Sequence, residues 1–329
     1  MITNGKSILI TGGTGSFGKR FVARLVADST FKNITVFSRD ELKQYEMKQE
    51  LNDPRINYLL GDVRDYERVY RALEDIDLVV HAAAMKQVPA SEENPMEAIK
   101  TNVLGAANII NACVERRVQK VIALSTDKAA NPVNLCGATK LCSDKLFVSA
   151  NNFPFSKNST KFSVVRYGNV LGSRGSVVPF FIRQRELGFI PITHKDMTRF
   201  WITLEQGISF VRKAFDLMSG GEIFIPKIPS FRIMDVAEVI APNIPVKFLG
   251  IRPGEKIHEV MITEDDARNT LDFLDHYRII ESPIMRNLIL ENDKSISRVE
   301  DNFTYNSQNN TKWLSKNEFF DLLVHENLA

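Results

Sequence analysis

The sequence predicts an α/β fold in which a doubly wound parallel sheet comes first and a smaller domain follows. Between residues 7 and 150, short apolar runs of strand length alternate with amphipathic stretches of helix length. Such alternation implies right-handed crossovers and a parallel sheet covered by helices on both faces. After about residue 170 the alternation becomes irregular, as in "PFFIRQRELGFIPIT". We therefore expect a first domain at residues 1–171 and a smaller second domain at 172–329.

The individual elements can be assigned in order from apolar periodicity and turn residues. The expected strands of the first domain are 7–12, 33–38, 56–62, 76–84, 120–126 and 161–172. A helix is expected after each of the first five strands, beginning with residues 16–27 and 40–51. The second domain should return in part to the main sheet. The polar tail, from about residue 290 to 329, should pack as an irregular extension.

Composition and charge restrict the class of protein. With 44% hydrophobic and 25% charged residues in 329, the composition is that of a globular protein. A net charge of +2 provides no basic field for nucleic acid or an anionic membrane. The sequence shows no secretory signal pattern and no apolar run near the roughly 18 residues of a spanning helix. Cys113, Cys136 and Cys142 have no metal spacing and are odd in number, which favours a reducing, cytoplasmic location.

A glycine-rich loop, "TGGTGSFG", follows the first strand and opens the first helix. Gly12, Gly15 and Gly18 have the spacing of a dinucleotide-binding loop, where glycine permits a tight turn and close approach to a pyrophosphate. The helix N-terminus then faces the phosphates. This loop predicts a sheet of the Rossmann type, and a glycine-rich turn without a ligand is the alternative. The other loop residues expected to touch the cofactor are Thr14, Ser16 and Phe17.

The end of the second strand indicates which nicotinamide nucleotide would bind. The sequence there reads "VFSRDELK", with Ser38 and Arg39 first and Lys43 one turn into the helix. Arg and Lys suit a 2′-phosphate, so these residues favour NADP. Asp40 keeps NAD possible, because an acidic residue at this position bonds the ribose hydroxyls.

The third and fourth strands end in residues that would lie beside the cofactor. Asp62 and Val63 stand where an adenine would lie, and Ala82 is small enough to pass under the cofactor. Lys86 is a candidate for a substrate phosphate, or it has no ligand at all. For His81, a local hydrogen bond at the strand end is a better interpretation than catalysis.

The stretch "ALSTDKAANPVNLCGATK" holds the candidate reaction centre. Ser125 and Thr126 end a strand, so their hydroxyls can point into a cleft above the carboxyl edge of the sheet. Asp127 and Lys128 follow, and an adjacent acid and base at such a strand end could serve two proton transfers at neighbouring carbons. A solvated turn is the alternative interpretation of this Asp-Lys pair.

Lys140 lies one helical turn after Cys136, on the same face of the expected helix. In a hydride-transfer site, a lysine holds the nicotinamide ribose and lowers the pKa of a neighbouring phenol. A thiol with an ordinary pKa of about 8.5 can ionise, but the Cys136 sulfur ends far short of where a phenol oxygen would lie. Cys136 is therefore better interpreted as a buried, inert cysteine.

The motifs together resemble a known superfamily. They are "TGGTGSFG", "STDKAANPVNL…GATK", "RYGNVLGSRGSVVPFF", "MTRFWIT" and "IRPGEKIHE". They resemble the extended short-chain dehydrogenase/reductases and, more narrowly, the soluble configuration-inverting UDP-N-acetylglucosamine 4,6-dehydratases of pseudaminic acid biosynthesis. The similarity runs from about residue 5 to beyond 260. Asp-Lys after Ser-Thr is the most specific part, because configuration-retaining 4,6-dehydratases typically have Asp-Glu there.

The resemblance implies a redox-neutral reaction with tightly bound, recycled NADP. The sugar would be oxidised at C4, Lys128 would remove the C5 proton, and Asp127 would protonate the departing 6-hydroxyl, with Thr126 orienting the sugar. Hydride would return to C6 and C5 would be reprotonated on the opposite face. The expected product is UDP-2-acetamido-2,6-dideoxy-β-L-arabino-hex-4-ulose.

Further positions follow from the resemblance alone. Asn169, Arg252 and Glu255 match places that the family uses near the UDP-sugar. The stretch Val170–Arg174 would touch the cofactor. Arg199 is a phosphate or sugar candidate, with a surface charge on a strand as the alternative. The resemblance also implies a homo-oligomer, with a hexamer as the expected form.

The departure from the family is Cys136, which stands where the family has the tyrosine that serves as base at C4. Loss of one positioned acid–base group costs about 10²–10⁴-fold in rate. There are three explanations. The chain is an engineered variant, or a natural divergent member in which Lys128 or water starts the oxidation, or a copy that has lost its activity. One alternative function is a UDP-sugar 4- or 5-epimerase, although simple epimerisation does not require Asp127-Lys128. The other is a non-catalytic NADP or UDP-sugar binding module.

Overall fold

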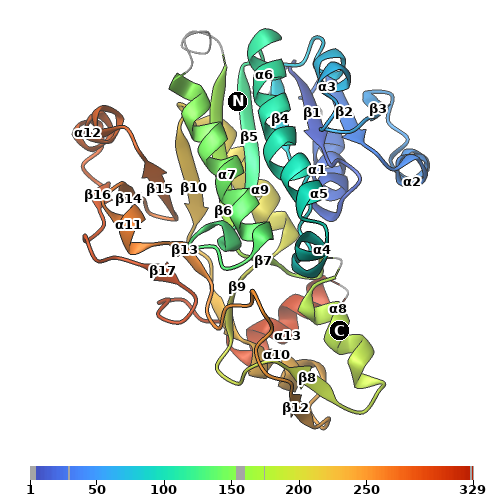
Figure 1. Ribbon diagram of the computed structural model, residues 1–329, viewed down its shortest axis with the longest axis vertical. Coiled ribbons are helices and arrows are strands. Elements are labelled where there is room, and N and C mark those ends of the chain that lie inside the picture. Colours follow the sequence, from blue (N-terminus) through green and yellow to red (C-terminus); the bar gives the residue numbers. More distant parts are fainter. Residues whose placement is uncertain (1–4, 29, 153–159, 174, 327, 329) are drawn as a thin grey trace.

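The computed structural model describes residues 5–28, 30–152, 160–173, 175–326 and 328. Its centre is a ten-stranded sheet with the strand order β16-β14-β15-β10-β6-β5-β4-β1-β2-β3 (Figure 1). The seven strands from β3 to β10 in this order run parallel, and β15, β14 and β16 are antiparallel additions at one edge. The order 3-2-1-4-5-6 is that of a Rossmann sheet, so the predicted fold class is confirmed.

The bounds of the six strands of the first domain lie within the expected ranges, but β3, β4 and β6 are shorter than the expected 56–62, 76–84 and 161–172. The bounds of all main-sheet strands follow. They are β1 Ser7–Thr11, β2 Asn33–Ser38, β3 Ile56–Leu60, β4 Leu78–His81, β5 Lys120–Thr126, β6 Lys161–Tyr167, β10 Glu222–Pro226, β14 Thr270–Asp272, β15 His276–Ile280 and β16 Ser297–Arg298. All five side chains of β1 are buried, as expected for a central strand with helices on both faces.

Helices cover both faces of the sheet. On one face lie α1 Ser16–Ala27, α2 Glu41–Leu51 and α9 Leu204–Leu217, and on the other lie α3 Tyr66–Ala72, α6 Gly105–Glu115 and α7 Leu135–Ser149 (Figure 1). Before α6 come two short helices and a π-helical turn, α4 Val88–Glu93, α5 Pro95–Ile99 and Lys100–Leu104. In α1, Phe21, Val22 and Leu25 are buried, which is the one-sided pattern of a helix packed on a sheet.

A smaller lobe lies beyond the carboxyl ends of the parallel strands (Figure 1). Its strands are β7 Asn169–Val170, β8 Ile190–Ile192, β9 Thr198–Ile202, β11 Ser230–Arg232 and β12 Val246–Phe248, and its helices are α8 Val177–Arg185, α10 Ile233–Ile240 and α13 Lys316–His325. The pairs β7–β9–β11 and β8–β12 form two small sheets. This lobe has its own apolar core, separate from that of the main sheet.

Residues beyond 172 also extend the main sheet, through β10, β15, β14 and β16. The antiparallel pair of β13 Val260–Ile262 and β17 Tyr305–Asn306 joins this region to the last part of the chain. The remaining helices are α11 Glu264–Ala267 and α12 Pro283–Asn292. The exact division into two domains at residue 171 stays a prediction.

The tail from residue 290 is more regular than its polar composition indicated, so the expected irregular extension is wrong for residues 316–325. Helix α13 begins with a capping box in which Ser315 and Glu318 satisfy each other's backbone donors. Phe319 and Leu323 are buried in the core of the smaller lobe. The polar residues of this segment form the caps and the outer face, and the apolar stripe holds the helix in place.

In the described residues, no helix has the length and apolar character required to cross a membrane.

Candidate active site

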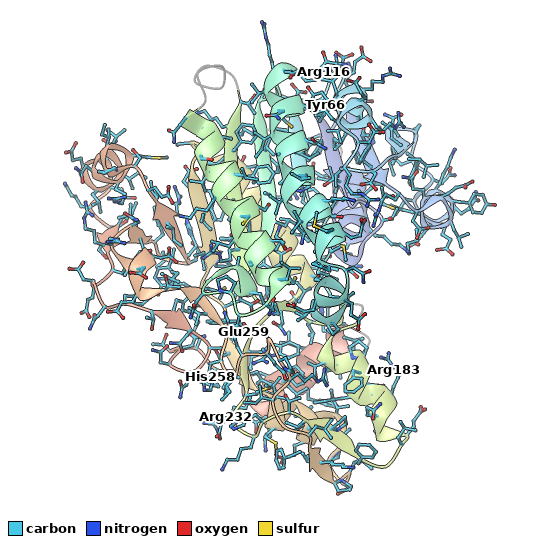
Figure 2. The ribbon with its side chains drawn as sticks, viewed as in Figure 1. Tyr66, Arg116, Arg183, Arg232, His258 and Glu259 are labelled. Atoms are coloured by element: carbon cyan, nitrogen blue, oxygen red, sulfur yellow. The ribbon has the colours of Figure 1, made fainter. Side chains whose placement is uncertain are left out.

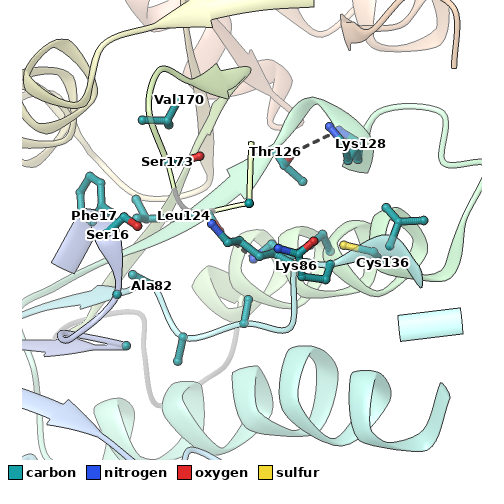
Figure 3. A pocket seen from close by; sticks show the side chains of 18 of the residues that line it. Ser16, Phe17, Ala82, Lys86, Leu124, Thr126, Lys128, Cys136, Val170 and Ser173 are labelled. Carbon is teal, nitrogen blue, oxygen red and sulfur yellow. Dashed lines mark hydrogen bonds between the residues drawn. The ribbon is translucent and has the colours of Figure 1, made fainter. Parts of the chain in front are cut away.

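A cleft of about 1390 Å³ lies at the carboxyl ends of the parallel strands and is shared by the main sheet and the smaller lobe (Figure 3). Nearly all predicted site residues line it. They are Gly12, Thr14, Gly15, Ser16, Phe17, Gly18, Ser38, Arg39, Asp40, Lys43, Asp62, Val63, Ala82, Lys86, Ser125, Thr126, Lys128, Cys136, Lys140, Asn169, Val170, Arg199, Arg252 and Glu255. Asp127 is buried behind this surface, and Arg174 is outside the described residues.

The glycine loop is shaped so tightly that side chains are excluded at two positions. Gly12 has a φ of +64°, and a Cβ there would lie 2.9 Å from the Cα of Ala83 at the end of β4. A Cβ at Gly18 would lie 2.5 Å from the Cα of Gly13, so α1 can approach its strand only with glycine. The N-terminus of α1 at Ser16 opens onto the cleft. These are the features that a dinucleotide pyrophosphate requires, so the residues present fit a dinucleotide.

The residues after β2 are arranged at the rim of the cleft. Asp40 caps α2 by accepting a hydrogen bond of 3.0 Å from the Lys43 backbone N–H, and its second oxygen pairs with the Lys43 ammonium. The Arg39 guanidinium is largely exposed and lies 3.5 Å from Asp62. Both side chains thus have a partner of opposite charge, Lys43 for Asp40 and Asp62 for Arg39, and Arg39 is the more exposed of the two.

The Asp127–Lys128 pair forms a single 3₁₀ turn, Asp127–Ala129, directly after β5. Oδ1 of Asp127 accepts a hydrogen bond of 2.8 Å from the Thr126 hydroxyl and one of 3.1 Å from Lys128 Nζ. Asp127 is fully buried, so the alternative of a solvated turn is wrong. Burial, and then the nearby Glu259 carboxylate, raise the pKa of Asp127. Burial opposes the charge of Lys128, but Asp127 and Glu259 hold the pKa of its amine above the usual range.

Cys136 and Lys140 lie on α7, and Cys136 is across the cleft from Ser16 and Phe17 of the glycine loop (Figure 3). The Cys136 thiol is buried, and its one hydrogen bond among the described residues is to the carbonyl oxygen of Met85 at 3.7 Å. Burial raises the pKa of this thiol, although Lys128 and Lys140 act in the opposite direction. Lys140 donates a hydrogen bond of 2.6 Å to the carbonyl oxygen of Leu124, and burial lowers the pKa of its amine. A short, protonated thiol is therefore a poor base at this position.

Ser125 and His81 belong to internal hydrogen-bond networks. The Ser125 hydroxyl donates to Asp144 at 2.7 Å, and Asp144 is in turn paired with Arg166 at 3.1 Å. His81 is buried and bonded to the Thr11 hydroxyl at 2.8 Å, and burial lowers the pKa of its ring to about 3. His81 thus has the local hydrogen bond that the sequence predicts, and it is neutral.

The smaller lobe closes the site with a cluster of charged residues from 199 and 252–259. Arg199 is buried, so its interpretation as a surface charge is wrong. Its guanidinium donates to the carbonyl oxygens of Thr198 and Ile257 at 2.7 and 2.9 Å. The Arg252 backbone N–H donates to Glu255 at 3.2 Å.

Sequence reasoning missed two charged residues of this cluster, Lys256 and, with the larger consequence, Glu259. Glu259 lines the cleft, is 3% exposed, and lies 3.3 Å from Lys128 Nζ and 3.7 Å from Arg199 Nε. An available signal was the position of an acidic residue directly before the apolar strand "VMI". Its partners are about 60 and 130 residues earlier in the chain, so its contacts could not be foreseen.

The fold and the cleft define the class of protein. A Rossmann-type sheet with a glycine loop, and a cleft shared with a smaller lobe, is the architecture of the extended short-chain dehydrogenase/reductases. The predicted membership in this superfamily is confirmed by comparison with known proteins.

The chain belongs to the polysaccharide biosynthesis protein family, whose model matches residues 8–281. It is 54% identical over 331 residues to the UDP-N-acetylglucosamine 4,6-dehydratase (inverting) of Campylobacter jejuni subsp. jejuni serotype O:23/36 (strain 81-176), with 98% of each chain covered. It is 40% identical to the UDP-glucose 4-epimerase of Rickettsia canadensis (strain McKiel), over 97% of this chain and 95% of the relative. Among solved structures, that of Pen from Bacillus thuringiensis has a TM-score of 0.91 and 37% identity, and covers 100% of both chains.

Proposed function

We propose that the chain is an inverting 4,6-dehydratase of UDP-N-acetylglucosamine whose turnover is slowed by Cys136. The observation that carries this proposal is the Asp127–Lys128 pair, in which Asp127 is buried and Lys128 lines the same cleft as Lys140 and the glycine loop. An acid next to a base at one strand end suits elimination of water, which needs a proton removed at one carbon and another supplied to the leaving oxygen. The relative at 54% identity with this named activity supports the same reaction.

The residues of this chain divide the proton transfers between them. Lys128, at the cleft surface, takes the C5 proton. Asp127 supplies the proton for the departing 6-hydroxyl, and because Asp127 is covered, that proton reaches the cleft through the Thr126 hydroxyl, 2.8 Å away. Lys140, held by the Leu124 carbonyl oxygen, orients the nicotinamide ribose. The bound nicotinamide supplies reversible hydride transfer, from C4 of the sugar and back to C6.

We propose NADP as the cofactor. Arg39 is exposed at the rim of the cleft, where a 2′-phosphate would accept its N–H donors. Asp40 is already engaged as the cap of α2 and as the partner of Lys43. Both facts favour a phosphate over free ribose hydroxyls at this end of the cleft.

The uridine diphosphate end of the substrate would lie against the smaller lobe, where Arg252 and Glu255 line the cleft together with Asn169. Lys86 also lines the cleft and is a second cation for the diphosphate. Arg199 is less suited to this role, because carbonyl oxygens already accept its N–H donors. A homo-oligomer, a cytoplasmic location and a place at the start of pseudaminic acid synthesis remain predictions from the resemblance.

Two other functions have specific support. Relatives named UDP-glucose 4-epimerase are 40% identical over nearly the full chain, which favours a UDP-sugar epimerase. Cys136, a protonated thiol where a base is needed, favours a binding module without turnover. Against the epimerase stands the Asp127–Lys128 pair, for which simple inversion at C4 has no use.

Mass spectrometry of UDP-N-acetylglucosamine after long incubation with a high concentration of the protein and NADP distinguishes the three. A product lighter by one water supports the dehydratase. A product of unchanged mass that is resolved by chromatography as the C4 epimer would support the epimerase. Recovery of unchanged substrate, together with binding of the sugar nucleotide in calorimetry, would support the binding module.

A further inference from the structure

The contacts of Glu259 assign a role to a residue that the motifs did not single out. Glu259 lies at the junction between the main sheet and the smaller lobe (Figure 2). Its backbone is fixed on both sides by Ser307: the Glu259 N–H donates to Ser307 Oγ at 2.9 Å, and the Ser307 N–H donates to the Glu259 carbonyl oxygen at 2.8 Å. The Ser307 hydroxyl also lies 2.7 Å from that of Thr198, beside Arg199 on β9. These contacts fix the backbone of Glu259, so its side chain extends from a fixed position in the fold.

The side chain of Glu259 completes the surroundings of Lys128. Lys128 Nζ lies between two carboxylates, 3.1 Å from Asp127 Oδ1 and 3.3 Å from Glu259 Oε1. The same oxygen, Glu259 Oε1, also lies 3.7 Å from Arg199 Nε. The second oxygens of both carboxylates, Asp127 Oδ2 and Glu259 Oε2, are buried without a hydrogen-bond partner in the described part of the chain. Two buried carboxylates thus face one amine, and only Glu259 has a second cation of its own.

This arrangement changes the pKa values of the two carboxyls in opposite directions. Burial opposes ionisation of Glu259, but Lys128, Arg199 and the ammonium of Lys256 together hold the pKa of its carboxyl below the usual range. The pKa of Asp127 is raised by burial and then by the Glu259 carboxylate, and its one ion pair in the described residues is with Lys128. Neighbouring carboxyls whose environments separate their protonation states in this way commonly have different roles. The charged and titratable groups around the pair are Asp127, Lys128, Cys136, Arg199, Glu255, Lys256, His258 and Glu259.

We propose that the ionised Glu259 is the positioning residue of the Asp127–Lys128 pair: it holds the Lys128 amine at the cleft wall and retains a single proton on the pair. This inference rests on the proposed dehydration. The pair reacts in a one-proton form with the proton on Asp127 and a neutral Lys128. Because the raised pKa of Lys128 places that proton on its amine at rest, the proton first moves along the 3.1 Å hydrogen bond from Lys128 Nζ to Asp127 Oδ1. With two protons the pair has no base, and with none it has no acid. The negative charge of Glu259 opposes loss of the last proton, because an anion near a titrating group favours the protonated form.

Every proton that moves in the elimination step has a donor and an acceptor. The C5–H bond breaks and its proton goes to Lys128, while its electron pair forms the C5–C6 double bond. The C6–O bond breaks, and the departing oxygen leaves as water with the proton of Asp127. The pair therefore has one proton before and after the step, moved from the carboxyl to the amine, and Glu259 gains and loses none.

The first test is made without cofactor or substrate. A small acylating reagent labels Lys128 through the neutral form of its amine. Peptide mass spectrometry gives the rate of this labelling at a series of pH values, and the midpoint of the resulting curve is the pH at which half of Lys128 is neutral. In Glu259→Gln, which keeps the shape of the side chain, the midpoint should fall by about one to three pH units. Glu259→Asp, which keeps the charge, should return the midpoint most of the way to its value in the parent protein. Glu255→Gln serves as the control for titration, since Glu255 lies 3.9 Å from Arg199 but forms no ion pair with Lys128 in the described residues.

The second test measures the reaction. In a Cys136→Tyr background, the alkaline limb of the pH profile for deuterium entry at C5 should move to lower pH in Glu259→Gln, in the same direction as the midpoint for Lys128. An unshifted midpoint in a folded Glu259→Gln protein, checked by its melting temperature, would overturn the role of Glu259. A shifted midpoint with no product from any form would instead overturn the proposed dehydration.

Discussion

The nucleotide end of the cleft and its proton-transfer end are built from the chain in different ways. At the nucleotide end, the glycine loop, the turn after β2 and the helix α1 all come from the first 43 residues, and the remaining lining residues directly follow the next two strands, β3 and β4. Local motifs therefore specify most of this geometry. At the other end, Lys128 follows β5, Arg199 lies on β9 and Glu259 precedes β13. These three residues meet only after the smaller lobe has folded against the main sheet.

The difference has an energetic side. The nucleotide end depends on backbone conformation and on the absence of side-chain atoms at Gly12 and Gly18. The proton-transfer end depends on a set of buried charges whose desolvation is offset only if every partner is present. Changes in the first region should therefore weaken cofactor binding or folding, whereas changes in the second should alter rates and titrations.

The largest effect should come from the proton-transfer end. In the Cys136→Tyr background, Lys128→Met should lower the rate of water loss by about 10²–10⁴-fold, because it removes the base at C5. It should also destabilise the fold, since Asp127 and Glu259 then face each other without the shared cation. Rates are measured by mass spectrometry of the sugar nucleotide. Lys227→Met, which breaks a pair with Asp272 outside the cleft, should leave the rate at that of the parent. A Lys128→Met rate within about threefold of the parent would mean that another group removes the C5 proton.

At the nucleotide end, Gly18→Ala should lower the free energy of unfolding by about 1–3 kcal/mol, because its Cβ would be placed 2.5 Å from the Cα of Gly13. Binding of NADP should weaken in parallel. Gly207→Ala is the matched control, since Gly207 is also in a helix but its added Cβ would meet nothing closer than 4.0 Å. That change should stabilise the protein by up to about 1 kcal/mol. Urea unfolding measures both, and equal effects of the two substitutions would contradict the close packing of α1.

A smaller effect should distinguish the two nicotinamide nucleotides. Arg39→Ala should weaken NADP binding roughly tenfold to hundredfold relative to NAD, the magnitude of a lost charge-assisted hydrogen bond. Calorimetry with each nucleotide provides the ratio. Lys48→Ala removes an exposed cation from the nearby helix α2, away from the cleft, and should leave the ratio unchanged. If NADP and NAD lose affinity equally in Arg39→Ala, Arg39 does not contact a 2′-phosphate.

The same comparison explains what the sequence could and could not predict. The strands, the glycine loop and the end of β5 follow from local patterns, because alternation and turn residues act over a few positions. Whether Arg199 is exposed or buried, and that Asp127 lies behind the cleft surface, depends on how the smaller lobe packs. Glu259 was overlooked for the same reason. The helix 316–325 was hidden by its polar neighbours, which proved to be its caps.

The most direct test of the central claim is proton NMR, in D₂O, of UDP-N-acetylglucosamine incubated with this chain and, in parallel, with Cys136→Tyr. We expect a 6-deoxy methyl signal and deuterium at C5, with the Tyr form faster by about 10²-fold or more. That result would establish the dehydratase and identify Cys136 as the disabling position. Equal rates in the two forms would contradict the assigned cost of Cys136. No methyl signal from either form would contradict the dehydratase itself.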